Sequence, residues 1–152
     1  MTIKEAIDKI DNLSPNQYSE EIKVDWLSRL DYRIFNDIIL RHLPPLPPPP
    51  QEIVAVSTAN PLDQDVRHIP PKKPEFEEYS VDDMTKQLLA PFPYDELYIF
   101  YLQMKIDETN KETAQYNNSA TLFNNYYENF AADYNRDHKP VNRARWNMWS
   151  RT

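Results

Sequence analysis

The side chains that could do acid–base chemistry in this chain are adjacent carboxylates. They form two pairs, Asp82 with Asp83 and Asp95 with Glu96. General acid–base catalysis uses positioned carboxyl groups of this kind. Both pairs, however, fall where helices are expected to begin, and the positive end of a helix dipole already explains acidic residues there. We therefore predict no catalytic residues and expect a protein that is not an enzyme.

Metal chemistry is not indicated either. The three histidines, His42, His68 and His138, are far apart in sequence, and the chain has no cysteine. The absence of cysteine removes disulfides, thiol catalysis and cysteine–zinc sites. Asp137 and His138 are adjacent but are expected to form a solvated helix end. No metal and no cofactor are predicted.

The composition is that of one small acidic domain. The 152 residues are enough for a single modest core. A formal net charge of −7 argues against general binding to nucleic acid or anionic membranes. The charge is uneven, because the segment from Arg136 to Thr152 holds five basic residues and one acidic residue. This tail is suited to an acidic partner.

The chain contains no glycine, although average usage is about 7%. Glycine-rich phosphate loops are therefore excluded, and helix C-caps must use other residues. No apolar run approaches roughly 18 residues, and the N-terminal MTIKEAIDKI lacks the apolar core of a signal peptide. We expect a soluble protein without membrane contact that is not exported by that route.

Two helices are predicted at the N-terminus. Thr2 and Glu5 have the spacing of a capping box, and Pro15 ends the first helix. Ser19 is expected to cap a second helix that extends to about His42. The apolar face of the first helix is Ile3, Ala6, Ile7 and Ile10. The stripe of the second is Ile22, Trp26, Leu30, Ile34 and Ile38, joined by Leu27, Phe35 and Ile39.

A proline-rich stretch follows, with ten of the 14 prolines between Pro44 and Pro74. It favours an extended, polyproline-like backbone, with one short strand predicted over residues 51–59. Arg41 to Pro47 spells RHLPPLP, which fits the arginine-anchored ligand of SH3 domains. A rigid spacer whose arginine belongs to the preceding helix is the favoured interpretation, because such short motifs recur by chance in any proline-rich tract. An interaction adaptor that binds an SH3-like domain through this motif is the alternative function.

Residues 75–89 mix aromatic and aliphatic side chains with acidic ones, which indicates a segment draped over the helices, with a turn at Asp82 and Asp83. Pro91 and Pro93 then introduce a third helix. The polar run 107–118 and a predicted cap at Ser119 indicate a break, followed by a fourth helix over about 119–136. The last two helices are expected to form an antiparallel hairpin.

The apolar spacing of the last two helices places one set of side chains on each buried face. The sets are Leu97, Tyr101 and Met104, and Phe123, Tyr127, Phe130 and Tyr134. Seven of the ten tyrosines lie between Tyr94 and Tyr134. Their hydroxyls need partners when buried, so they either lie at the edge of the core or line an interface.

These patterns predict a mainly α protein with a small four-helix bundle-like domain. Its N-terminal helices occupy residues 1–42 and its C-terminal helical pair residues 91–138. Residues 43–90 form a proline-rich extended insertion, and residues 139–152 form an extended arm.

Three blocks of the sequence resemble a known family. They are SPNQYSEEIKVDWLSRLDYRIF, LLAPFPYDELYIFYLQMKID and YNNSATLFNNYYENFAADYNRDH, with PYDELY and YNNS the most recognisable pieces. The blocks resemble head–tail connector proteins, also called adaptor or head-completion proteins, of tailed bacteriophages and prophages of Gram-positive hosts. The likeness covers about residues 3–42 and 85–139. The stretch from Leu43 to Pro74 is longer than the family's connecting loop.

The resemblance implies a non-enzymatic virion protein at the phage neck, made in the host bacterial cytoplasm. Such proteins form a ring of about twelve copies beneath the portal protein and extend the DNA channel to the next connector, stopper or tail protein. Double-stranded DNA passes through without sequence-specific binding. An acidic body suits a channel wall that repels phosphate, although ordinary surface acidity explains the charge equally well.

A ring would give surplus aromatic side chains a place to be buried. We therefore predict an inter-subunit helical face formed by Tyr98, Tyr101, Tyr126, Tyr127 and Tyr134.

The C-terminal arm combines tryptophan with arginine, the residue types that most often anchor protein interfaces. Its anchors are Arg143, Arg145, Trp146 and Trp149. We predict that the arm docks on the portal or on a neighbouring copy, by strand addition or a related mode. The alternatives are docking on the chain's own helices and, less favoured, contact with nucleic acid.

Overall fold

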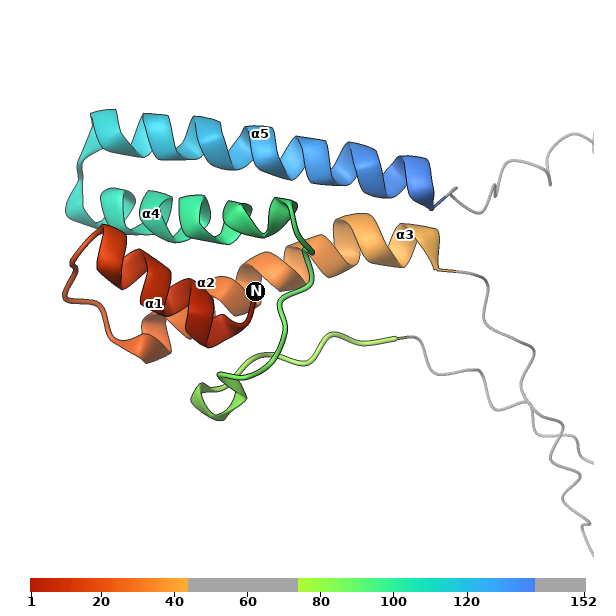
Figure 1. Cartoon of the computed structure of the whole chain (residues 1–152), viewed down its shortest axis with the longest axis horizontal. Coiled ribbons are helices and arrows are strands. Elements are labelled where there is room, and N and C mark those ends of the chain that lie inside the picture. Colours follow the sequence, from red (N-terminus) through yellow and green to blue (C-terminus); the bar gives the residue numbers. More distant parts are fainter. Residues whose placement is uncertain (44–73, 139–152) are drawn as a thin grey trace, which may run out of the picture. The chain divides into compact units, whose positions relative to one another are not determined.

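The computed structural model describes residues 1–43 and 74–138 and consists of helices joined by turns and one extended segment (Figure 1). The chain divides into two compact units, Met1–Leu43 with Phe76–Thr152, and Pro44–Glu75. All described helices belong to the first unit, which is the subject below. The prediction of a mainly α-helical domain built from about four helices is confirmed. The strand predicted at 51–59 and the C-terminal arm lie outside the described residues.

Helix α1 (Ile3–Leu13) begins with the predicted capping box. The hydroxyl of Thr2 accepts from the amide of Glu5 (3.2 Å), and the Glu5 carboxylate accepts from the amide of Thr2 (2.8 Å). The amides of the first two helical residues donate to the carbonyl oxygens of Lys86 (3.1 Å) and Met84 (3.0 Å). The free donors of this helix end are thus satisfied partly by a distant segment. The predicted apolar face of α1 is buried.

The second predicted helix is present as three consecutive segments. These are α2 (Glu20–Ile34), the π-helical turn η1 (Phe35–Ile39) and α3 (Leu40–His42). The amide of Leu40 donates to the carbonyl of Phe35, five residues back, as a π turn requires. Ser19 occupies the N-cap position, but its hydroxyl makes no capping hydrogen bond, so the predicted side-chain cap is wrong.

The predicted apolar stripe of this helix is buried along most of its length. Leu27, Leu30, Ile34 and Ile38 are buried, whereas Ile22 is 42% exposed near the N-terminus. The sequence pattern did not predict the polar side chains buried on the same helix, which are Lys23, Ser28 and Asp31. Lys23 pairs with Asp11 of α1 (Nζ to Oδ1, 2.5 Å) and so links the first two helices.

Helix α4 (Leu97–Asn110) follows the short 3-10 turn η3 (Tyr94–Glu96), which holds the acidic residues predicted at this helix start. Helix α5 (Thr113–Asp137) begins well before the predicted cap at Ser119, so that prediction is wrong. The break predicted in the polar run 107–118 is present at Lys111, whose left-handed backbone (φ 62°) ends α4 and reverses the chain. Ser119 is inside α5, where it is buried.

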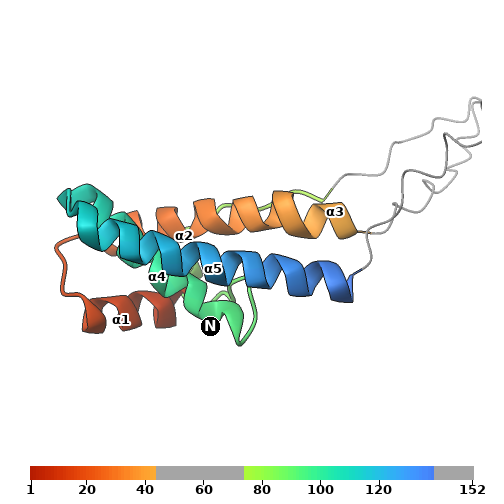
Figure 2. The same cartoon turned by 90° about the horizontal axis from the view of Figure 1, so that it is seen from above.

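Helix α4 lies at the centre of the arrangement. It packs against α5 on one side and against α1 and α2 on the other. Figures 1 and 2 show α5 returning alongside α4 in the opposite direction. The predicted antiparallel hairpin is therefore confirmed, and α5 forms an outer layer.

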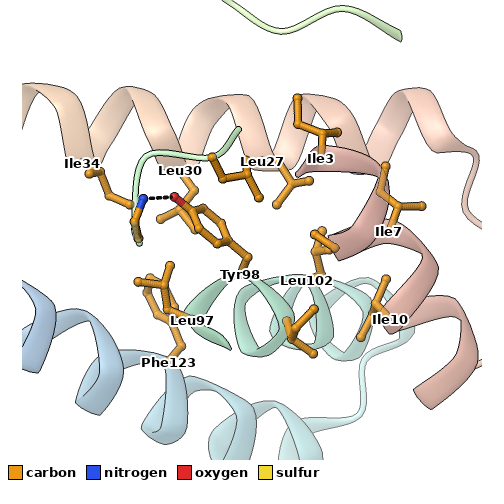
Figure 3. Packing of buried hydrophobic residues seen from close by; sticks show 14 of the residues in the cluster. Ile3, Ile7, Ile10, Leu27, Leu30, Ile34, Leu97, Tyr98, Leu102 and Phe123 are labelled. Carbon is orange, nitrogen blue, oxygen red and sulfur yellow. Dashed lines mark hydrogen bonds between the residues drawn. The ribbon is translucent and has the colours of Figure 1, made fainter. Parts of the chain in front are cut away.

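The core is assembled from one face each of α1, α2, α4 and α5 (Figure 3). Leu97 and Leu102 of α4 are fully buried and lie among side chains from α1, α2 and α5. Burying a side chain of this size stabilises the fold by about 1.5–3 kcal/mol. The larger members of the core are Ile3, Ile7, Ile10, Leu27, Leu30, Ile34, Leu97, Tyr98, Leu102, Ile106, Phe123 and Phe130.

The extended segment before η3 is draped over the helices, as predicted. Tyr79 and Leu88 are buried, and the ring of Phe76 lies 5.9 Å from that of Phe35. The 3-10 turn η2 (Val81–Asp83) is closed by a capping box between Ser80 and Asp83. Within residues 1–43 and 74–138, no helix is both long and apolar enough to cross a membrane.

Candidate interaction surfaces

The carboxylate of Asp31 on α2 is completely buried. Its oxygens accept hydrogen bonds from the hydroxyls of Tyr98 (2.5 Å) and Tyr79 (2.6 Å) and from the amide of Leu89 (3.1 Å). The Tyr98 hydroxyl in turn accepts from the amide of Ala90 (2.8 Å), the contact dashed in Figure 3. We call this group the Asp31 cluster.

Burial raises the pKa of Asp31, because it removes water from the charged carboxylate, while the two tyrosine hydroxyls and the Leu89 amide oppose that rise. Burial, reinforced by the nearby carboxylate, also raises the pKa of Tyr79 and of Tyr98. A catalytic base must reach its substrate, and Asp31 has no exposed surface. The cluster therefore acts as a clamp that ties residues 79–90 to α2 and α4.

A second buried carboxylate, Asp107, secures the α4–α5 turn. Its carboxylate accepts from the hydroxyl of Ser119 (2.7 Å) and from the side-chain amide of Gln103 (2.7 Å). The carbonyl of Asp107 accepts from the amide of Glu112 (2.9 Å). The contacts of Asp107 with Ser119 and Glu112 cross the reversal at Lys111 and hold the two helices in their antiparallel arrangement.

Three of the four carboxylates considered at the outset have structural partners. Asp83 accepts from the Ser80 amide (2.8 Å), and this bond lowers the pKa of its carboxyl. Asp95 lies 3.7 Å from the N-terminal ammonium, and Glu96 accepts from the hydroxyl of Tyr126 (2.9 Å). In the described part of the chain, no three or more His, Asp or Glu side chains gather as a metal site.

The structure places Tyr98 inside the core, not on a surface. Its side chain has no exposed area, because its ring fills the space between α2 and α4 and its hydroxyl is held by Asp31. A fully buried side chain cannot contact another subunit. The assignment of Tyr98 to an inter-subunit face is therefore wrong.

The other four tyrosines of that predicted face are partly exposed along the line where α4 and α5 meet. Tyr101 and Tyr127 both contact the buried ring of Phe123, at centroid distances of 5.3 and 5.7 Å. Tyr126 packs instead on Phe100 (5.1 Å). Their rings thus cover the core and leave one edge towards water. They lie at the edge of the core and do not gather into a single patch.

Tyr134 marks the end of the unit where α3 and α5 terminate. Its ring contacts His42 of α3 (5.5 Å) and Phe130 of α5 (6.0 Å). The His42 Nε2 lies 2.6 Å from the side-chain oxygen of Asn135. The residues that precede segments 44–73 and 139–152 are therefore held close together at one end of the helical unit.

The binding motifs predicted in the two segments fall mostly outside the described residues. Arg41 of the RHLPPLP motif is an exposed residue of α3, as the spacer interpretation expected, and the motif from Pro44 onward is not described. The docking-arm residues Arg143, Arg145, Trp146 and Trp149 also lie outside the described ranges.

No protein-family model matches the chain, and comparisons with curated proteins and with solved structures give no significant match.

Proposed function

We propose that the chain is a structural virion protein of a tailed phage, a head–tail connector that assembles as a ring beneath the portal protein. The observation that supports this proposal is the contact of His42 with Asn135 and Tyr134. This contact brings the ends of α3 and α5 together, so that two long segments depart from one end of a packed helical unit. A compact body with several connecting segments is suited to a repeating subunit that contacts more than one neighbour.

The role proposed for each part of the chain follows from its chemistry. The helical unit forms the ring wall, held rigid by the Asp31 and Asp107 hydrogen bonds. The basic C-terminal arm, with Trp146 and Trp149, docks on the portal or on the next copy. The acidic body repels the phosphates of the passing duplex, which keeps DNA from binding to the channel wall.

The experiment combines the full chain with the portal protein of the same phage or prophage and images the mixture by negative-stain electron microscopy. We expect ring-shaped density seated on the portal. A chain that stays monomeric in the presence of the portal contradicts the proposal.

The arm is tested separately by ending the chain at Lys139. Circular dichroism should show the helical content of the full chain, because the described core contains none of the removed residues. Portal attachment should be lost, and the double variant Trp146→Ala with Trp149→Ala should reproduce the loss. Attachment that survives both changes would show that the arm is not the docking element.

A further inference from the structure

The outer surface of α5 carries a regular stripe of exposed, uncharged side chains. The buried side of α5 is formed by Ser119, Phe123 and Phe130, which pack towards α4. About a third of a turn round the helix from this buried side lie exposed residues spaced alternately by four and three, which we call the amide seam. Its members are Asn118, Leu122, Asn125, Asn129 and Ala132. Figures 1 and 2 show that α5 has no other described helix on its outer side.

The amide seam lacks the charges that normally cover an exposed helix. Its first three members lie within residues 113–127, which contain no Asp, Glu, Lys or Arg and form the longest such run in a chain of net charge −7. Asparagine is also a poor helix former, less favourable than alanine by about 0.5 kcal/mol per residue. A helix surface that only contacts water is more stable with glutamate or lysine, which are better helix formers. The asparagines of the seam are therefore unfavourable for an isolated helix surface.

The spacing and chemistry of the seam suit contact with another protein surface. Alternating steps of four and three residues form the line along which packed helices meet. Leu122, which is 44% exposed, supplies an apolar side chain as the second residue of that line. The side-chain amide of each asparagine both donates and accepts hydrogen bonds. It can therefore pair with an uncharged polar side chain on the other surface.

The charge of the whole chain favours this face for a contact between copies. Two copies of a protein of net charge −7 repel each other, and that repulsion is weakest where the facing surfaces carry no charge. We propose that the amide seam packs against a second copy of this chain. The inference rests on the proposed ring for its geometry, in which the seam of one copy meets a different face of the next.

The test uses a double variant, Asn118→Glu with Asn125→Glu, analysed by sedimentation velocity over a range of concentrations. Glutamate favours a helix more than asparagine does, so thermal stability should stay unchanged or rise. Self-association of the wild type should be weakened about ten-fold or more, because two carboxylates enter the contact. The matched control is Asn12→Glu with Gln17→Glu, two exposed sites that give the same change in net charge. It should weaken association much less.

A wild type that remains monomeric at every concentration overturns the inference. It is likewise overturned if the seam variant associates as strongly as the control variant.

A second measurement separates this inference from the proposed function. The chain has no cysteine, so Leu122→Cys gives a single attachment point for a benzophenone cross-linker. Cross-links to a different element of the neighbouring copy support both the seam and the ring. Cross-links from α5 to α5 support the seam but contradict the ring, because they indicate a two-fold dimer. If the seam variant still forms rings on the portal, the connector function is supported and the inference about the amide seam is overturned.

Discussion

Asp31 shows at the scale of single residues how this small core accommodates a charged group. The carboxylate has three donors, and all of them come from the extended segment or from α4. Removing one partner of a buried carboxylate costs more than an average hydrogen bond, because the remaining group stays buried. The clamp therefore makes the position of residues 79–90 depend on one side chain of α2.

We predict that Tyr98→Phe destabilises the protein by about 2 kcal/mol at neutral pH. The substitution removes the donor to Asp31 and leaves the amide of Ala90 without its acceptor. Chemical denaturation followed by circular dichroism measures the change. Tyr18→Phe is the control, because its exposed hydroxyl bonds only an amide oxygen of Asn110 (2.7 Å). The control should change the free energy of unfolding by less than about 0.5 kcal/mol.

The effect of Tyr98→Phe should depend on pH. The folded-state pKa of Asp31 lies above its unfolded value, so the folded protein binds the proton more tightly. Stability from this group is therefore present at acid pH and falls as pH rises from the unfolded to the folded pKa. Losing the Tyr98 donor penalises the ionised carboxylate most, so the destabilisation should be greater at neutral than at acid pH. Denaturation series at several pH values test this, and a constant difference would contradict it.

At the scale of elements, the α4–α5 turn shows what the absence of glycine requires. Lys111 ends α4 with a left-handed backbone that costs a residue with a Cβ about 1–2 kcal/mol. Asp107 compensates by bonding Ser119 of α5. The hairpin therefore forms without the residue that usually ends a helix in this way.

We predict that Lys111→Gly raises the free energy of unfolding by about 0.5–1 kcal/mol. Glycine adopts the left-handed conformation without a Cβ clash, although part of the gain is lost because the unfolded chain becomes more flexible. Thermal denaturation measures the change. In the control Ala114→Gly, the same residue enters the helical backbone of α5 and should destabilise by about 1 kcal/mol. Equal destabilisation by both changes would contradict the assigned role of Lys111.

At the scale of the whole molecule, the net charge of −7 opposes contact between the acidic bodies of two copies. Two routes to self-association have opposite salt dependence. Contact through the uncharged amide seam must overcome repulsion between the acidic bodies. Contact through the basic arm would instead gain from attraction to an acidic neighbour.

We therefore predict that self-association strengthens when salt rises from about 0.05 M to about 0.5 M, because screening reduces the repulsion. Sedimentation velocity at both salt concentrations measures the change. The chain ending at Lys139 should respond more steeply, since it has lost Arg143, Arg145 and Arg151. Association that weakens with salt would indicate that the arm, and not the seam, makes the contact.

The amino-acid sequence by itself determined the features that depend on neighbouring residues. The Thr2–Glu5 capping box, the apolar face of α1 and the helix start after Pro93 follow from groups within a few positions of one another. Helical periodicity likewise predicted the α4–α5 hairpin. Such local signals are present in the chain before it folds.

Only the tertiary structure decided which polar side chains enter the core. The sequence pattern predicted that Tyr98 lies on a surface. In the folded protein its hydroxyl is buried between Asp31 and the Ala90 amide. The start of α5 was decided in the same way, because the pairing of Asp107 with Ser119 supports a turn at Lys111 that helix propensity disfavours. Buried hydrogen bonds join residues far apart in sequence, so their partners exist only once the helices have packed.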